Sequence, residues 1–325
     1  MKYLRFTVRN YKAIRGPLVV NLERFPLLPL IGLNESGKTS VLEAALAFDS
    51  YSDEQNNGRH LKDLLDLTDP GSNEEPQVTA ELEVPTDQLI SHIHKLRGAA
   101  EAKSQTSEAE ELATLAQHVA DTQVDRVEVA RTLSSDGDHS YHFPAWTERL
   151  SIANHEDLAE EIVSTLPHVL FFDDFRARRD HVIPLVADEE SREWTKIIQQ
   201  LFNKAGCGVK LEELPNDPRT RDTLLGRAEA FLNQRIADEW AAFHLEKGPE
   251  GQIRLRLRYI DQPRPSIRID VVEQTERGSV VFNISDRSKG FFWFFNFVMK
   301  LEFNPKAVGT ASQRAVFLLD EPGSF

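Results

Sequence analysis

The chain has 325 residues, of which 40% are hydrophobic, so it is long enough to form one large domain or two ordinary domains around a packed core. Its formal net charge of −14 argues against a surface that is basic throughout, although local basic patches can still bind nucleic acid. The single cysteine, Cys207, excludes an internal disulfide framework and a thiolate metal cluster. No charged-then-apolar leader opens the sequence, and no apolar run is long enough to cross a bilayer. We therefore expect a cytoplasmic protein without membrane contact.

The chain opens with two predicted strands, at residues 3–8 and 17–22, in which apolar and polar residues alternate. The polar sequence RNYKAIRG, residues 9–16, joins them as a turn. The apolar run Leu27–Ile31 then predicts a buried strand that leads into a glycine-containing loop. A sheet-based core is therefore expected to begin at residue 1.

The loop GLNESGKTS, residues 32–40, fits the pattern G-x-x-x-x-G-K-[ST] at each fixed position. Apolar residues at helical spacing follow Lys38, so the loop is expected between a strand and a helix N-terminus, where backbone N–H groups and the helix dipole attract an anion. Lys38 would bind the β- and γ-phosphates of ATP, and the Thr39 hydroxyl would bind Mg²⁺. The predicted nucleotide-binding residues are Gly32, Asn34, Glu35, Ser36, Gly37, Lys38, Thr39 and Ser40.

The middle of the chain predicts a mixed, mainly helical insert. The expected strands are residues 77–84, 124–133, 140–143 and 168–172, and the expected helical regions are residues 86–120, 155–166, 189–204 and 218–244. Two of these strands are expected to pair as a hairpin across SSDGDH, because Asp-Gly is a turn signal. Asn154 or His155 is expected near one helix cap, and Asp217 at another. Asp173 and Asp174, in FFDDFRARRD, are interpreted as turn caps that pair with the following arginines, with an insert-domain site as the alternative.

Three short strands are predicted after the insert, at residues 252–259, 266–272 and 280–284. In the first of them the arginines project to one face and the apolar residues to the other, because strand side chains alternate. We interpret this row as the solvated side of an antiparallel sheet; the alternative is a surface for the phosphate backbone of nucleic acid. The arginines of the row are Arg254, Arg256 and Arg258.

The end of the chain, AVFLLDEPGSF, contains an apolar run, Ala315–Leu319, that predicts a buried strand followed by two acids. An acid at the carboxyl end of a strand beside the phosphate loop can hold Mg²⁺ through water, and Asp320 has this position. The next residue, Glu321, can then orient and partly deprotonate the attacking water. We expect Glu321 and Lys38 to be catalytic, and Thr39 and Asp320 to bind the metal.

A helix rich in aromatic residues is predicted just before this strand, in NISDRSKGFFWFFNFVMKL, residues 283–301. Its aromatic density requires burial. Its polar prefix is expected at the helix N-terminus, where free N–H groups and cationic side chains attract a phosphate. The residues of interest there are Ser288, Lys289 and Gly290.

The order of phosphate loop, long insert, signature-like helix start and DEPG strand resembles the head of an ABC-type ATPase. The sequences of the three motifs, GLNESGKTS, SDRSKGFFWFFNF and LLDEPGS, are most similar to those of the overcoming-lysogenization-defect (OLD) family. The resemblance implies an α/β fold, an ABC-type P-loop ATPase head with a mixed sheet, an antiparallel β lobe and a largely helical insert. It divides the chain into residues 1–84, the N-terminal part of the head; 85–250, the insert; and 251–325, the C-terminal part.

The same resemblance implies a function. ATP and Mg²⁺ would be the cofactors, and two copies of the chain would sandwich ATP, with Ser288, Lys289 and Gly290 reaching the γ-phosphate bound by the other copy. Such a homodimer or higher oligomer would control a DNA-directed nuclease or effector in antiphage defence. It also implies that RNYKAIRG lies near the nucleotide, which we weigh equally with a solvated hairpin loop.

Most family members carry a TOPRIM nuclease domain after the ATPase, whereas this sequence ends at Phe325, directly after DEPG. We expect that it is truncated there, since a cut directly after a catalytic strand would expose a sheet edge. Two other functions stay open. One is a DNA-repair ATPase of the RecF and SMC kind, in which ATP gates DNA binding, and the other is an ATP-bound scaffold that presents its inserts to a partner effector.

Overall fold

The chain packs as two compact units. Unit 1 comprises Met1–Phe171 and Thr310–Asp320, and unit 2 comprises Phe172–Gly309 and Glu321–Phe325. These units differ from the three parts expected from the sequence, whose boundaries were residues 84 and 250. The expected insert, residues 85–250, contributes elements to both units. The computed structural model describes residues 1–23, 27–33, 36–50, 75–134, 139–172, 182–188, 191–242, 253–275, 278–303 and 315–320.

Unit 1 contains a five-stranded antiparallel sheet in the order β2-β1-β3-β4-β5. Side chains of β1 and β3 alternate between buried and more exposed positions, and the buried set forms the core. All five strands were predicted from the sequence, and the expected hairpin across SSDGDH is the β4–β5 pair. The strands are β1 (Lys2–Arg9), β2 (Leu18–Asn21), β3 (Gln77–Glu83), β4 (Arg126–Thr132) and β5 (Ser140–His142).

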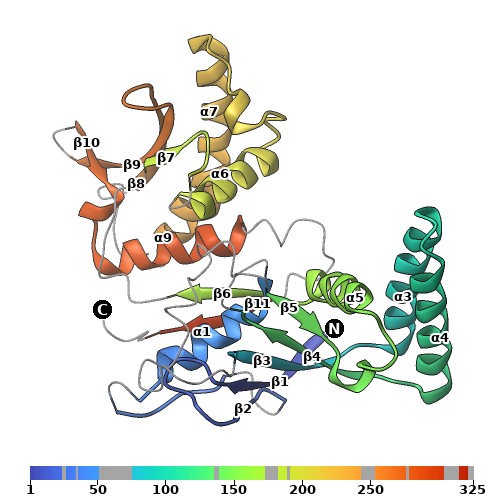
Figure 1. Cartoon of the computed structure of the whole chain (residues 1–325). Coiled ribbons are helices and arrows are strands. Elements are labelled where there is room, and N and C mark those ends of the chain that lie inside the picture. The colour runs from blue at the N-terminus through green and yellow to red at the C-terminus, as the bar shows by residue number, and fades with distance from the viewer. Residues whose placement is uncertain are drawn as a thin grey trace. The chain divides into compact units, whose positions relative to one another are not determined.

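Within the described ranges, four helices accompany this sheet. The loop helix α1 (Lys38–Phe48) buries its last five residues in the core of unit 1. The predicted helical region 86–120 is a pair of helices, α3 (Thr86–Ala102) and α4 (Thr106–Thr122), which lie side by side (Figure 1). Helix α5 (Ile152–Thr165) begins at Ser151, whose hydroxyl accepts a hydrogen bond from the N–H of Asn154, so the cap lies three residues before the predicted position.

In a second, two-stranded sheet, β6 (His168–Phe172) pairs with β11 (Ala315–Leu319). Both strands were predicted from the sequence. In β11 only Leu318 is buried, so this strand is more exposed than its continuous apolar sequence predicts. Asp320 follows directly after β11.

The prediction of a buried strand at Leu27–Ile31 is wrong. These residues form no strand, and the side chains of Leu27 and Ile31 are 76% and 92% exposed. Pro29 gives the physical reason, because a proline inside the run has no N–H group to donate to a strand ladder. The loop is therefore entered from a segment that forms no strand with the described residues.

Unit 2 contains a four-stranded antiparallel sheet in which β9 pairs with each of the other three strands. In β8 the apolar residues are buried and the arginines are exposed, in strict alternation, as the sequence predicts. The expected strands at residues 252–259, 266–272 and 280–284 are therefore confirmed. The strands are β7 (Val182–Pro184), β8 (Ile253–Ile260), β9 (Ser266–Thr275) and β10 (Gly278–Asn283).

The helices of unit 2 cluster with the apolar residues of this sheet. Asp217 caps α7 as predicted, because its carboxylate accepts a hydrogen bond of 2.9 Å from the N–H of Thr220. The long helix predicted at residues 218–244 is interrupted by one π-helical turn, Asn233–Ala237. The aromatic helix α9 buries Phe291, Phe292 and Phe295, which confirms the burial expected from its composition. The helices are α6 (Arg192–Lys204), α7 (Pro218–Leu232), α8 (Asp238–Ala242) and α9 (Lys289–Glu302).

Candidate functional site

The phosphate loop ends at Gly37, which is the N-cap of α1 and has left-handed backbone angles of φ 86° and ψ 13°. No side chain caps the helix, and its first turn has no acidic residue. The first N–H groups of a helix have no acceptor within the helix. Within the first turn of the helix itself, no acidic residue offsets these N–H groups or the positive end of the helix dipole, an arrangement that favours an anion.

The two loop glycines are required for different reasons. At Gly37 a side chain would be strained, since φ lies in the left-handed region. At Gly32 a Cβ atom would lie 2.6 Å from the hydroxyl of Ser36, so that hydroxyl would have to rotate away. Both glycines therefore fit the turn that the sequence predicts at these positions.

Lys38 points back along the loop. Its ammonium group donates hydrogen bonds to the carbonyl oxygens of Gly32, at 3.0 Å, and Leu33, at 2.6 Å. These two carbonyls satisfy part of the lysine's hydrogen-bonding capacity, and a phosphate would have to compete with them. The lysine is thus held within the loop.

Thr39 and Asp320 are 281 residues apart in the sequence and meet in unit 1. The Thr39 hydroxyl donates a hydrogen bond of 2.9 Å to the carboxylate of Asp320. Two neighbouring ligands of an octahedral Mg²⁺, with bonds of about 2.0–2.1 Å, lie about 2.9 Å apart. The two oxygens therefore have the chemistry and spacing that a magnesium ion accepts, with phosphate oxygens and waters as its remaining ligands.

The turn at residues 9–16 packs against the loop and its helix. A Cβ atom on Gly37 would lie 3.5 Å from the Cβ of Ala13, and Lys12 forms an ion pair with Glu43 of α1. Tyr11 is fully buried and anchors the turn. These contacts favour the interpretation in which RNYKAIRG lies near the loop. No sequence pattern predicts the Lys12–Glu43 pair, since the two residues belong to different elements.

The signature-like residues lie at the N-terminus of α9 in unit 2. The Ser288 hydroxyl caps the helix by accepting a hydrogen bond of 3.2 Å from the N–H of Phe291. Ser288, Lys289 and Gly290 are all exposed, so a second molecule can reach them.

Several predicted residues lie outside the part of the chain that the structure describes: Asn34, Glu35, Glu321, Asp173 and Asp174. Ser36 and Ser40 lie within it, at the loop and in the first turn of α1. Among the described residues, no group of three or more acidic, histidine or cysteine side chains could hold a metal ion. Nor does any helix in the described ranges have the length and apolarity to span a membrane.

The arginine row of β8 has two kinds of member. Arg258 lies 3.4 Å from the fully buried carboxylate of Asp270, which Arg268 also contacts at 2.6 Å. Arg254 and Arg256 are exposed, and neither forms an ion pair with any residue in the described part of the chain.

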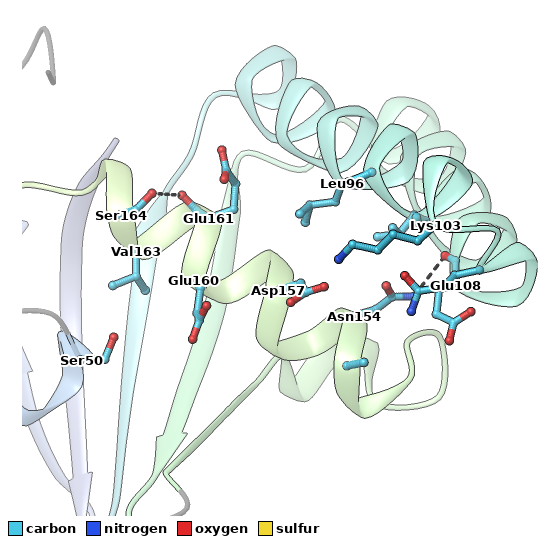
Figure 2. A pocket seen from close by; sticks show the side chains of 15 residues that line it. Ser50, Leu96, Lys103, Glu108, Asn154, Asp157, Glu160, Glu161, Val163 and Ser164 are labelled. Atoms are coloured by element: carbon cyan, nitrogen blue, oxygen red, sulfur yellow. Dashed lines mark hydrogen bonds between the residues drawn. The ribbon is translucent and has the colours of Figure 1, made fainter.

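A cavity of about 530 Å³ lies in unit 1, between α5 and the α3–α4 pair. Figure 2 shows Lys103, Glu108, Asp157 and Glu160 around it, and Ser50 at one edge. None of the predicted nucleotide-binding residues lines this cavity. The phosphate loop and this cavity are therefore separate features of unit 1.

No family model and no curated protein matches the chain. Solved structures that resemble it include an SMC head bound to the C-terminal winged-helix domain of ScpA, at 13% identity and a TM-score of 0.46, covering 98% of this chain and 90% of that one. Another is an SMC head with an extended coiled coil bound to the C-terminal domain of ScpA, from Pyrococcus furiosus, at 12% identity and a TM-score of 0.42, covering 98% and 89%. A third, from work on ATP-driven dimerisation and DNA-stimulated activation of SMC ATPases, has 15% identity and a TM-score of 0.30, covering 50% and 79%. With every TM-score below 0.5, these likenesses assign no activity to the chain.

Proposed function

We propose that the chain is an ATP-binding and ATP-hydrolysing head of the ABC type, which pairs with a second copy of itself around Mg²⁺ and ATP. The observation that carries the proposal is the 2.9 Å contact between Thr39, in the first turn of the loop helix, and Asp320, after β11. The two separate motifs of a P-loop ATPase meet at one point. A chance match to either motif alone would not require this contact.

Each residue of the loop would have a distinct role. Lys38 would exchange the carbonyls of Gly32 and Leu33 for the β- and γ-phosphates, while the N–H groups of the loop and of α1 bind the same oxygens. Thr39 and Asp320 would hold Mg²⁺, which neutralises charge on the phosphates. Most of the catalysis of phosphoryl transfer comes from such positioning and electrostatic stabilisation.

Two further groups complete the proposed reaction. Glu321, the residue after Asp320, would accept a proton from the attacking water. Ser288, Lys289 and Gly290 of a second copy would contact the γ-phosphate, and their exposure at the start of α9 supports this role. Hydrolysis would thus require two copies of the chain.

The test compares Lys38→Ala and Glu321→Gln with the parent protein, and uses Lys103→Ala, an exposed lysine of the α3–α4 turn, as the matched control. We expect Lys38→Ala to lose ATP binding and Glu321→Gln to bind ATP without hydrolysing it. Light scattering should then show a larger assembly for Glu321→Gln only with Mg²⁺ and ATP. Full ATP affinity in Lys38→Ala would refute the proposal, and ATP binding without hydrolysis by the parent would favour a scaffold.

We further propose that the head controls a DNA-directed nuclease or effector in antiphage defence, as a member of the OLD family. The sequences of the three motifs support this assignment to the OLD family. A phage plaque assay in cells that carry the complete system would test it. Protection that survives Lys38→Ala would separate defence from the ATP site.

A second function, an ATPase whose nucleotide gates binding to duplex DNA, is favoured by the arginine row. Arg254 and Arg256 are exposed and have no ion-pair partner in the described ranges, so they suit phosphate oxygens. DNA affinity should then fall with salt and require ATP, and Arg254→Glu with Arg256→Glu should abolish it. DNA affinity independent of both ATP and salt would exclude this function.

A further inference from the structure

The C-terminal end of the loop helix is bound by side chains from two strands of the large sheet. Arg131 of β4 donates a hydrogen bond from Nη1 to the carbonyl of Ala47, and the Tyr141 hydroxyl of β5 donates one of 2.5 Å to the carbonyl of Phe48. The last carbonyls of a helix have no partner within the helix. Both side chains therefore satisfy groups that would otherwise be buried without one.

Arg131 and Tyr141 act together because they are direct cross-strand partners in the β4–β5 ladder. The guanidinium carbon lies 5.4 Å from the centre of the tyrosine ring, and the two residues are only 4% and 5% exposed. The tyrosine also accepts a hydrogen bond of 3.0 Å from the N–H of Ser50. One pair thus holds the end of α1 and Ser50, two residues beyond it. We call Arg131 and Tyr141 the helix clamp.

The charge of the clamp suits its position. The last turn of α1 has no basic residue of its own, and the C-terminal end of a helix carries partial negative charge. The buried guanidinium of Arg131 supplies a positive charge from a different element. Burial raises the pKa of Tyr141 to about 12, so its hydroxyl keeps the proton that it donates to Phe48.

The other end of the same helix carries the proposed phosphate and metal ligands. Lys38 and Thr39 are the first two residues of α1, and Ala47 and Phe48 are the last two. Eleven residues of α-helix rise about 15 Å from first to last and move as a stiff rod. A shift of about 1 Å in a catalytic group can cost about 100-fold in rate. The position of the helix along its axis therefore matters for the loop.

We propose that Arg131 and Tyr141 are positioning residues for the ATP site: the helix clamp fixes α1 along its axis and so holds Lys38 and Thr39 at the correct distance from Asp320. This rests on the proposed function for its effect on catalysis. The clamp itself is independent of ATP. Ser50, which the clamp also binds, lines the cavity in Figure 2, so the clamp joins that part of unit 1 to the phosphate loop.

Tyr3 provides a matched control. It is 5% exposed, like Tyr141, and both belong to the same core cluster around Phe48. The Tyr3 hydroxyl has no hydrogen-bond partner among the described residues, whereas that of Tyr141 binds the helix end. Tyr3→Phe and Tyr141→Phe thus remove the same atom from the same core, and only one of them removes a contact with α1.

The first measurement is hydrogen–deuterium exchange of the ATP-free protein. Tyr141→Phe should speed exchange of the amides of residues 41–43, whose hydrogen bonds close the first turn of α1, at least threefold relative to the parent, and Tyr3→Phe should leave it within twofold. This result does not depend on any activity. Equal exchange in the two variants would overturn the proposal, even if the parent protein proves unable to bind ATP.

The second measurement is steady-state ATP hydrolysis by folded variants, confirmed by thermal melting. Tyr141→Phe should lower kcat about tenfold with less than a threefold change in KM, because a displacement of about 1 Å leaves Lys38 and Thr39 in contact with ATP but misplaces them for the transition state. Arg131→Lys keeps the charge at the helix end and should recover part of the kcat lost in Arg131→Met. A kcat for Tyr141→Phe equal to that of Tyr3→Phe, in a parent that hydrolyses ATP, would refute positioning and leave the proposed function standing.

Discussion

The contact between Thr39 and Asp320 predicts a specific pattern of coupling. Thr39→Val removes the hydroxyl and keeps the β-branched shape, and Asp320→Asn removes the negative charge and keeps the size. Because the two atoms are hydrogen-bonded at 2.9 Å, either change alone breaks the same bond. The double variant should therefore lose less than the sum of the two single variants.

The expected size of the coupling depends on Mg²⁺. Without ligand, the contact is one hydrogen bond to a carboxylate in a solvent-accessible position, so the coupling in the free energy of unfolding should be about 1 kcal/mol. With Mg²⁺ and ATP, both side chains would hold one ion. Each single variant should then weaken Mg²⁺-dependent ATP binding about tenfold or more, and the second change should add little.

Isothermal titration calorimetry with ATP, in Mg²⁺ and in EDTA, measures this pattern, and urea unfolding measures the coupling without ligand. Thr114→Val is the control, since its hydroxyl is exposed on α4 and bonds only the carbonyl of Glu110. Additive losses in both experiments, or equal losses in Mg²⁺ and in EDTA, would show that the two residues do not share a metal ion.

Three other predictions follow from single residues. Gly37→Ala should cost about 1–2 kcal/mol of stability and weaken ATP binding, because its φ of 86° strains any side chain; Gly226→Ala, in the interior of α7 with open space around it, should be neutral or stabilising in the same melting assay. Asn233→Ala should cost about 2–4 kcal/mol in urea unfolding, because its amide pairs with both the N–H and the C=O of Leu255; a loss below 1 kcal/mol would contradict this. Burial raises the pKa of Tyr141 in the folded protein from 10.0 to about 12. The free energy of unfolding should therefore be constant below pH 10 and fall by about 3 kcal/mol as the pH rises towards 12. Tyr141→Phe should flatten that fall in pH-dependent melting.

Most strands of the two larger sheets could be predicted from the sequence because their signals are local; the three-residue strand β7 was not predicted. Alternation in residues 77–84 and 252–259 predicts strands that bury one face, and β3 and β8 have that pattern. The loop helix and its glycine cap follow from the spacing around Lys38 in the same way. Each prediction needs only a short window of sequence, so no knowledge of the tertiary fold was required.

The errors in prediction arose where a local signal conflicts with backbone chemistry. Leu27–Ile31 has the apolar composition of a buried strand, but Pro29 removes a ladder donor and the segment stays unpaired. The helix expected at residues 218–244 contains a π-helical turn because Asn233 turns its amide to the backbone of β8. Composition does not reveal such a contact.

The candidate site also has a part that local sequence predicts and a part that it does not. Its chemistry, a lysine and a threonine after a glycine and an acid after an apolar run, could be predicted from motifs alone. The contacts that hold the site in place could not be predicted in this way. The ion pair of Lys12 with Glu43, and the contacts of Arg131 and Tyr141 with the end of α1, join elements that are distant in sequence and match no motif.

The contacts of Lys38 and Thr39 give a reason why ATP and Mg²⁺ would bind together. Lys38 is held by two loop carbonyls, and Thr39 is held by Asp320, so each proposed ligand of the nucleotide already has a protein partner. ATP alone would have to displace Lys38 while its phosphates stay close to the charge of Asp320. Thr39 and Asp320 would hold a magnesium ion, whose positive charge would offset that repulsion. We therefore expect that Lys38 and Thr39 would replace their protein partners with the least loss of free energy when the metal and the nucleotide bind as one complex.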